Sequence, residues 1–438
     1  MISIKYIFTE IQSQYLEDDK NIPWIIGFSG GKDSTMLLQL VWYALREFPK
    51  DHLQRDIYVV CNDTLVENPK IVQYTNGILK KIEKAAIEQG MPLRVITTSP
   101  KLEDTFWVNL VGKGYPAPNN TFRWCTERLK INPTTDFIKS KISEVGQAII
   151  LLGTRKEESA ARATSMNNHT KEGTRLRKHV LPNAYVFSPI QDIKVTELWQ
   201  YLNQVKSPWG ADNKQLNALY RNANGGDCPL VIDETSPSCG NSRFGCWVCT
   251  VVKKDKSMEA LILNGEEWME PLMEIRDLLV DNRNNPEWRQ STRRNGTDGF
   301  GPYRPEKRAE ILEALLKAQK EVKQTDDTLS LINYQELVAI QIQWHRDNIF
   351  NQSVSDIYNR VNGTDLTDLD LSESISIEKR LLSESCIDSP NDVRLIEELL
   401  ELQKTKILMV KNRGLNNDLE KHLEKFIKSS KKELTDAD

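Results

Sequence analysis

The sequence contains no apolar run that approaches the length of a membrane-spanning helix, and it has only seven cysteines in 438 residues. A spanning helix needs about 20 predominantly apolar residues, so we expect no membrane partner. So few cysteines argue against a disulfide framework and favour a reducing, cytoplasmic location. The first twenty residues mix polar and acidic side chains, which is not the pattern of a secretory leader.

The chain also lacks a strong net charge, because its total is −4. The charge is uneven, however. Residues 325–438 carry 22 acidic and 14 basic side chains, a net of −8, and the rest of the chain carries +4. Any nucleic-acid surface is therefore expected in the first three quarters of the chain. No internal repeat is present.

Short apolar runs alternate with helical patterns in the first half of the chain. The runs at 23–28, 56–61, 93–97 and 148–153 predict strands, and helical patterns cover 1–22, 32–48, about 68–89, 134–145 and 190–206. This alternation predicts an α/β fold with a doubly wound parallel sheet, whose ligands lie at the carboxyl ends of the strands. Residues 207–250 are expected to be loop-rich. Helical patterns resume at 256, with an interruption at 282–303.

These patterns suggest three parts. We expect a nucleotide-binding α/β domain over 1–206, a region of cysteines and basic helices over 207–324, and an acidic helical region over 325–438.

The first predicted strand runs into Ser29-Gly30-Gly31-Lys32-Asp33-Ser34, directly before a helical pattern. Glycines let the backbone approach an anion, and the first amides and the dipole of the helix favour negative charge there. A kinase-type phosphate loop needs a glycine where Ile26 stands, and it has no aspartate after the lysine. The alternative is a glycine-rich turn without a ligand.

Polar residues follow the other strands and are expected to line the same crevice. Asp63 and Thr64 follow the second strand, and Gly153-Thr154-Arg155 follows the fourth. Arg155 and Arg162 are suited to clamp phosphate oxygens in a bidentate manner. The alternative for this stretch is a salt-bridged helix start, and both interpretations can hold together.

Four cysteines are spaced Cys228-x10-Cys239-x6-Cys246-x2-Cys249 among glycines and prolines. Four thiolates on loops can converge on one zinc ion or one iron–sulfur cluster. The spacing alone leaves these two open.

Cys125 lies in Arg123-Trp124-Cys125-Thr126-Glu127-Arg128-Leu129-Lys130, and its three bases are expected to lower the pKa of the thiol. The alternative is a buried structural cysteine, which is also the interpretation favoured for Cys61. A basic, aromatic-rich stretch at 283–308 is typical of a phosphodiester contact or, more often, of a solvated face.

Two resemblances follow from these residues. Ser29–Ser34 resembles the PP-loop of ATP pyrophosphatases, which cleave ATP between the α and β phosphates. Together with Cys228–Thr250, Arg123–Lys130 and Gly153–Arg162, it makes residues 20–320 similar to the DndC family of bacterial DNA phosphorothioation systems, relatives of phosphoadenylylsulfate (PAPS) reductases.

This resemblance implies specific roles. ATP and Mg²⁺ would be bound by the loop, with Lys32, Asp33, Arg155 and Arg162 acting on phosphates and Cys125 as a sulfur carrier. The four spaced cysteines would hold a [4Fe–4S] cluster. DNA would be the substrate, a cysteine desulfurase the sulfur donor, and other phosphorothioation subunits the partners.

Three other functions fit the same residues. They are a PAPS-reductase-type enzyme, a PP-loop tRNA thiolase and a non-catalytic ATP-gated DNA-binding subunit of a modification complex.

Overall fold

The computed structural model describes residues 4–17, 22–158, 175–223, 245–349, 351–365, 395–396 and 398–399. The chain divides into two compact units, Met1–Phe106 with Pro118–Asp277, and Trp107–Ala117 with Leu278–Asp438. The domain boundaries expected from composition and motifs stay predictions. None of the described helices is both long enough and apolar enough to span a membrane.

The described part of the first unit contains a six-stranded sheet in the order β3-β2-β1-β4-β6-β5. Its strands are β1 (Trp24–Gly27), β2 (Ile57–Asn62), β3 (Leu93–Thr98), β4 (Ala148–Leu151), β5 (Arg177–Lys178) and β6 (Ala184–Phe187). Every neighbouring pair is parallel except β5, which is antiparallel to β6 at the edge. The predicted α/β fold with a mostly parallel sheet is confirmed, and β5 and β6 are additional strands that the sequence pattern did not predict.

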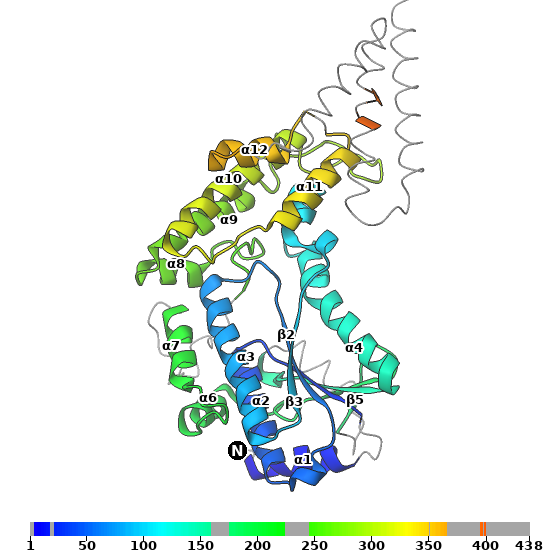
Figure 1. The fold of residues 1–438 in the computed structure, drawn as a ribbon, viewed down its shortest axis with the longest axis vertical. Helices are drawn as coiled ribbons and strands as arrows, with labels where there is room; N and C mark the ends of the chain where they lie inside the picture. Colours follow the sequence, from blue (N-terminus) through cyan, green and yellow to red (C-terminus); the bar gives the residue numbers. More distant parts are fainter. Residues whose placement is uncertain are drawn as a thin grey trace, which may run out of the picture. The chain divides into compact units, whose positions relative to one another are not determined.

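Helices cover both faces of this sheet (Figure 1). The α-helices in the described part of the first unit are α1 (Ile4–Leu16), α2 (Lys32–Arg46), α3 (Pro69–Gln89), α4 (Asn132–Val145), α6 (Val195–Gln204), α7 (Asn213–Ala223) and α8 (Lys256–Leu263), and α9 (Glu270–Asn282) contains the boundary with the second unit. The expectation that 207–250 is loop-rich is wrong for α7. That helix is rich in Asn and other polar residues, and only a narrow apolar stripe containing Leu216 and Tyr220 packs inward.

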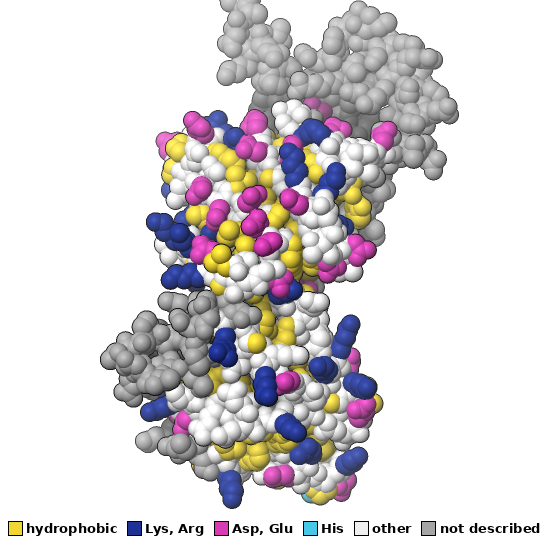
Figure 2. Space-filling model, turned by 90° about the vertical axis from the view of Figure 1, so that its left-hand side faces the viewer, with side chains coloured by type: hydrophobic (Ala, Val, Ile, Leu, Met, Phe, Trp, Pro, Cys, Tyr) yellow, Lys and Arg dark blue, Asp and Glu magenta, His cyan; other side chains and the backbone are white. Residues whose placement is uncertain are grey.

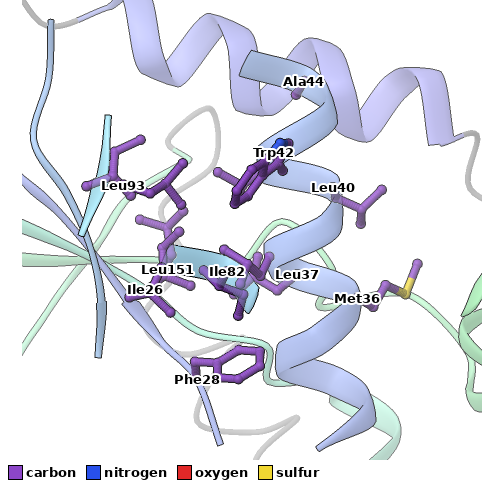
Figure 3. Close-up of a cluster of buried hydrophobic side chains, with 14 of the residues drawn as sticks. Ile26, Phe28, Met36, Leu37, Leu40, Trp42, Ala44, Ile82, Leu93 and Leu151 are labelled. Carbon is purple, nitrogen blue, oxygen red and sulfur yellow. The ribbon is translucent and has the colours of Figure 1, made fainter. Parts of the chain in front are cut away.

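Alternating side chains of the strands build two apolar layers. Trp24 and Ile26 of β1 belong to a large buried cluster with α2, whereas Ile25 belongs to a smaller cluster with Ile138 of α4. Leu37 and Trp42 of α2 belong to the larger cluster, and Figure 3 shows their side chains facing the sheet. Successive strand residues point to opposite faces, so continuous apolar runs are required for strands covered on both sides.

The second unit is helical and takes in a segment from the first half of the chain. Its other helices are α10 (Pro305–Thr325), α11 (Tyr334–Arg346) and α12 (Val354–Asn362). The short helix η3 (Val108–Gly112) packs on α10 and α11. The indole of Trp107 donates to the carbonyl of Leu331 (2.8 Å), and that of Trp344 donates to the carbonyl of Val111 (2.9 Å). Two buried indoles thus hold the segment in place.

Candidate active site

The loop Ser29-Gly30-Gly31 connects β1 to α2, and Gly31 is the N-cap residue of that helix. The hydroxyl of Ser34 accepts a hydrogen bond from the Ser29 amide (3.2 Å) and donates to the Gly31 carbonyl (3.1 Å). The side chain therefore closes the loop on itself. The first amides of a helix have no intrahelical carbonyl partner and carry the positive end of the dipole, which is the geometry that the predicted binding of an anion requires.

Two glycines are required by close contacts around the loop. Gly30 has a φ angle of +72°, and a Cβ atom there would lie 2.6 Å from Oγ1 of Thr75 on α3. A Cβ atom on Gly153, just beyond β4, would lie 2.8 Å from the Asp33 carbonyl oxygen and 3.1 Å from the Ser34 amide nitrogen. The end of β4 thus supports the first turn of α2, and the loop is held from both sides.

Arg155 reaches the loop through Asp33. Its Nε donates to Oδ1 of Asp33 at 2.6 Å, and its Nη1 donates to Glu157 (3.0 Å) and to the carbonyl of Ile193 (3.2 Å). The side chain of Arg155 is only 4% exposed. The ion pair with Glu157 is of the kind that the salt-bridged alternative predicted, and a contact between Arg155 and phosphate stays a prediction. The structure places the guanidinium against carboxylates, in a position to orient Asp33.

Lys32 lies between a carboxylate and an aromatic ring. Its Nζ is 3.1 Å from Oδ2 of Asp33 and 5.1 Å from the ring centroid of Tyr220. Tyr220 belongs to α7, and the sequence analysis did not identify it. The spacing of Leu216 and Tyr220 on one face of a short helical pattern is the signal that could have found that helix.

The segment after β2 meets the cysteine-bearing segment. Glu67 and Cys246 form an antiparallel bridge, and the Trp247 amide donates to the Val66 carbonyl at 3.0 Å. The Thr64 hydroxyl lies 3.5 Å from Sγ of Cys246. The carboxylate of Asp63 accepts from the Leu65 amide (2.8 Å) and shapes this turn. Asp63 and Thr64, expected to line the crevice, therefore lie between the end of β2 and the segment that carries Cys246.

Cys246 and Cys249 share one tight turn, in which the Cys249 amide donates to the Cys246 carbonyl at 3.0 Å. Trp247 and Val248 between them are buried. Cys228, Cys239 and Arg162 lie outside the described residues. Within the ranges that the structure describes, no three His, Cys, Asp or Glu side chains are grouped closely enough to hold a metal ion.

The segment that contains Cys125 also docks at the end of β2. The Asn62 side chain donates to the carbonyl of Leu129 at 2.8 Å and accepts from the Thr98 hydroxyl at 3.1 Å. The ammonium of Lys130 lies 3.8 Å from Glu67. The pKa of Lys130 is raised, chiefly by its Coulombic attraction to the ionised form of Cys246, with Glu67, Cys125 and Cys249 adding to the effect. Three segments that are distant in the sequence thus meet around one lysine.

The predicted low pKa of Cys125 is wrong. Burial raises the pKa of this thiol, and Lys130 opposes the rise only weakly. The other two bases of the segment are engaged elsewhere, because Arg123 donates to Asn120 (3.0 Å) and Arg128 pairs with Asp104. Burial likewise raises the pKa of Cys246 to about 11 and that of Cys61 to about 12. Without a bound metal, these thiols are protonated at neutral pH.

The basic stretch 283–308 in the second unit contains arginines with structural roles. Arg289 is 5% exposed and donates to the carbonyls of Gly301 (2.6 Å), Arg283 (2.8 Å) and Phe300 (3.2 Å). Arg308 is 2% exposed and binds the Gly112 carbonyl (3.0 Å). On the face drawn in Figure 2, basic side chains are interspersed with acidic ones. The buried arginines are therefore removed from any surface that a phosphodiester could contact.

A mostly parallel sheet with a glycine-rich loop between its first strand and first covering helix defines a doubly wound α/β protein. The family model of the phosphoadenosine phosphosulfate reductase domain matches residues 23–252. The chain belongs to this family.

Several known proteins are similar to the chain. An uncharacterized protein of Methanocaldococcus jannaschii is 28% identical over 231 residues, which make up 53% of this chain and 37% of that protein. The chain therefore matches little more than a third of the relative's length.

Two solved structures align with TM-scores of 0.30. A PAPS reductase from Candida auris in complex with phosphate is 12% identical, with 50% of this chain and 93% of that chain covered. The U34-tRNA thiolase NcsA from Methanococcus maripaludis, with its [4Fe-4S] cluster, is 15% identical, with 71% and 88% covered. Neither alignment bears on function at these scores.

Proposed function

We propose that this protein is an ATP pyrophosphatase that activates a DNA phosphodiester for replacement of one non-bridging oxygen by sulfur. The observation that carries the proposal is that the anion-binding loop follows β1 and the Cys246 segment pairs with residues that follow β2. These two strands are parallel neighbours, so a nucleotide and the thiols would meet at one edge of the sheet. DNA as the acceptor rests on the resemblance to the DndC family.

The chemistry explains why one protein would combine these elements. A non-bridging oxygen of a phosphodiester is a poor leaving group. If that oxygen attacks the α-phosphorus of ATP, the bond to the β-phosphate breaks and pyrophosphate leaves. A sulfur nucleophile then attacks the DNA phosphorus, and the activated oxygen leaves with AMP. A persulfide from a cysteine desulfurase would supply the sulfur, and a thiol reductant would cleave the sulfur–sulfur bond to release the carrier.

The residues of the loop suit the first step. The amides of the first turn and the ammonium of Lys32 would bind the β and γ phosphates, which become the pyrophosphate. Asp33 would offer an oxygen to Mg²⁺, because a carboxylate has about four acceptor positions and Arg155 occupies one of them. Arg155 would keep the carboxylate oriented while the ammonium of Lys32 turns to the phosphates.

The segment that carries Cys246 and Cys249 has the sulfur donors that an iron–sulfur cluster requires. Cys246 and Cys249 offer two thiolates on one turn, walled by buried Trp247 and Val248, and Lys130 would offset negative charge. Cys228 and Cys239 would complete the ligands. A [4Fe–4S] cluster bound by these four cysteines would supply electron transfer. Cys125 would serve as a sulfur carrier beside it.

The direct test is the release of pyrophosphate and AMP from ATP in the presence of DNA. Lys32→Ala should lower the rate about a hundredfold, since it removes the point charge that binds the leaving pyrophosphate. The control is Lys80→Ala, which changes an exposed lysine on α3. Undiminished release by Lys32→Ala would show that this loop is not the site.

Membership of the PAPS reductase family supports a second candidate, reduction of a small sulfated nucleotide. That activity would release sulfite from PAPS with a thiol reductant and without ATP. Mass spectrometry of hydrolysed cellular DNA separates the two. Phosphorothioate dinucleotides that disappear when the gene is deleted support the first proposal, and their persistence after deletion overturns it.

A further inference from the structure

Tyr220 contacts the anion-binding loop in two ways. Its hydroxyl accepts a hydrogen bond from the Lys32 amide at 3.3 Å, and its ring lies 5.1 Å from the Lys32 ammonium. The hydroxyl oxygen would also be 3.2 Å from a Cβ atom on Gly31. The side chain is 6% exposed and packs edge-on against Trp199 of α6, with ring centroids 5.2 Å apart.

The Lys32 amide is one that a phosphate would be expected to use. Lys32 is the first residue of α2, so its amide has no intrahelical carbonyl partner. The tyrosine hydroxyl accepts from this amide in the direction from which a phosphate oxygen would approach. Gly31 leaves the space that the hydroxyl needs, because any larger residue would press on it. A phosphate oxygen and the hydroxyl cannot both occupy this position.

We propose that Tyr220 is a displaceable occupant of the loop, which holds the Lys32 amide in the nucleotide-free protein and yields it to a phosphate of ATP. This inference rests on the proposed function, because it assumes that the loop binds phosphates. The ring keeps the Lys32 ammonium near its working position through a cation–π contact, and the hydroxyl competes with the ligand. Tyr220 is thus a positioning residue that sets the affinity of the loop.

Displacement of the hydroxyl would loosen the second half of α7. The start of this helix is fixed, because the Asn213 side chain donates to the carbonyl of Leu202 (2.9 Å) and accepts from Gln39 (3.1 Å). Tyr220 lies two turns further along the helix, which packs on α8. Loss of the contact with Lys32 therefore removes a restraint from the end of α7 and leaves its start in place.

The test measures the dissociation constant of magnesium pyrophosphate by titration calorimetry on the full chain. Tyr220→Phe removes the hydroxyl and keeps the ring, so the dissociation constant should fall about threefold to tenfold, as expected for removing one competing neutral hydrogen bond. An unchanged value would mean that the hydroxyl only packs, and a higher value would mean that it binds the phosphate directly. Either result overturns the proposal.

Two further variants make the outcome specific. Tyr201→Phe is the matched control, because Tyr201 is buried in α6 and its hydroxyl has no hydrogen-bond partner in the described part of the chain. If Lys32→Ala leaves pyrophosphate binding intact, the loop is not the site and both proposals fall. If Lys32→Ala weakens binding but Tyr220→Phe does not strengthen it, only the role of Tyr220 is refuted.

A measurement on the unaltered protein does not depend on whether the variants fold. Hydrogen exchange of the amides in the second half of α7 should become faster when pyrophosphate is added. The amides around Asn213 should stay unchanged. Slower or unchanged exchange in the second half of α7 would refute displacement.

Discussion

Replacing Gly153 by alanine should damage the loop without touching any of its charged groups. The added Cβ atom would lie 2.8 Å from the carbonyl oxygen of Asp33 and 3.1 Å from the amide nitrogen of Ser34, whereas ordinary van der Waals contacts begin at 3.4 Å. Both neighbours are backbone atoms, so relief requires the first turn of α2 or the end of β4 to move by about half an ångström.

The size of the effect follows from this displacement. Overpacking of this kind costs about 1–3 kcal/mol of unfolding free energy. A misplacement of about 1 Å can cost about a hundredfold in rate, so half of it should lower pyrophosphate release by about tenfold. The assays are the thermal unfolding midpoint by calorimetry and the rate of pyrophosphate release from ATP.

Gly77→Ala provides the matched control. Gly77 lies within α3, and a Cβ atom there would meet nothing within 4 Å. Alanine should stabilise the helix by about 0.5–1 kcal/mol and leave the rate unchanged. If Gly153→Ala unfolds and reacts like the unaltered protein, then the end of β4 does not support the loop and the reasoning fails.

Four further predictions concern charge and burial. Arg155→Met should leave Asp33 without its guanidinium partner, lower the rate of pyrophosphate release by at least tenfold and lower the free energy of unfolding by about 1–3 kcal/mol. A normal rate in that assay would show that the pair has no role. Arg289→Ala should lower the thermal unfolding midpoint by several degrees, because three backbone carbonyls lose their hydrogen-bond donor. The control is Arg293→Ala, which changes an exposed arginine nearby and should leave the midpoint unchanged. Equal midpoints for the two variants would contradict the structural role of Arg289. In metal-free protein, alkylation of Cys246 should be slow at pH 8 and rise about tenfold per pH unit up to its pKa of about 11, as followed by mass spectrometry of the labelled peptide. The pKa of Cys246 is higher in the folded protein than in the unfolded chain, so the thiol's contribution to the free energy of unfolding is complete below about pH 8.5 and is lost as the pH rises to 11. Cys246→Ala should flatten this decline of the unfolding free energy with pH.

The sheet was largely predictable because its central strands are local apolar runs. β1, β2 and β4 are buried on both faces, which requires continuous apolar sequence. β6 was missed because its four residues follow a long polar stretch, and they become a strand through parallel pairing with β4. α7 was missed because most of its residues are polar and only a narrow stripe is buried.

The candidate site was predictable only in its local parts. The loop Ser29–Ser34 is a contiguous motif, so its position between a strand and a helix could be read directly. The environment of Cys125 could not, because Arg128 is held by Asp104 and burial outweighs Lys130. The bases next to Cys125 in the sequence predicted a lowered pKa for its thiol, whereas burial raises it, because packing and not sequence proximity sets the partners of a side chain.

The sequence by itself determined the α/β fold, the position of the glycine-rich loop and the relation to PAPS reductases, because each is encoded in local patterns of glycine, apolar runs and spacing. Tertiary structure decided which groups act on the loop. Asp33 meets Arg155 from 122 residues away, and Lys32 meets Tyr220 from 188 residues away. Thr64 meets Cys246 from 182 residues away. Such contacts arise from how strands and helices pack, and no local pattern specifies them.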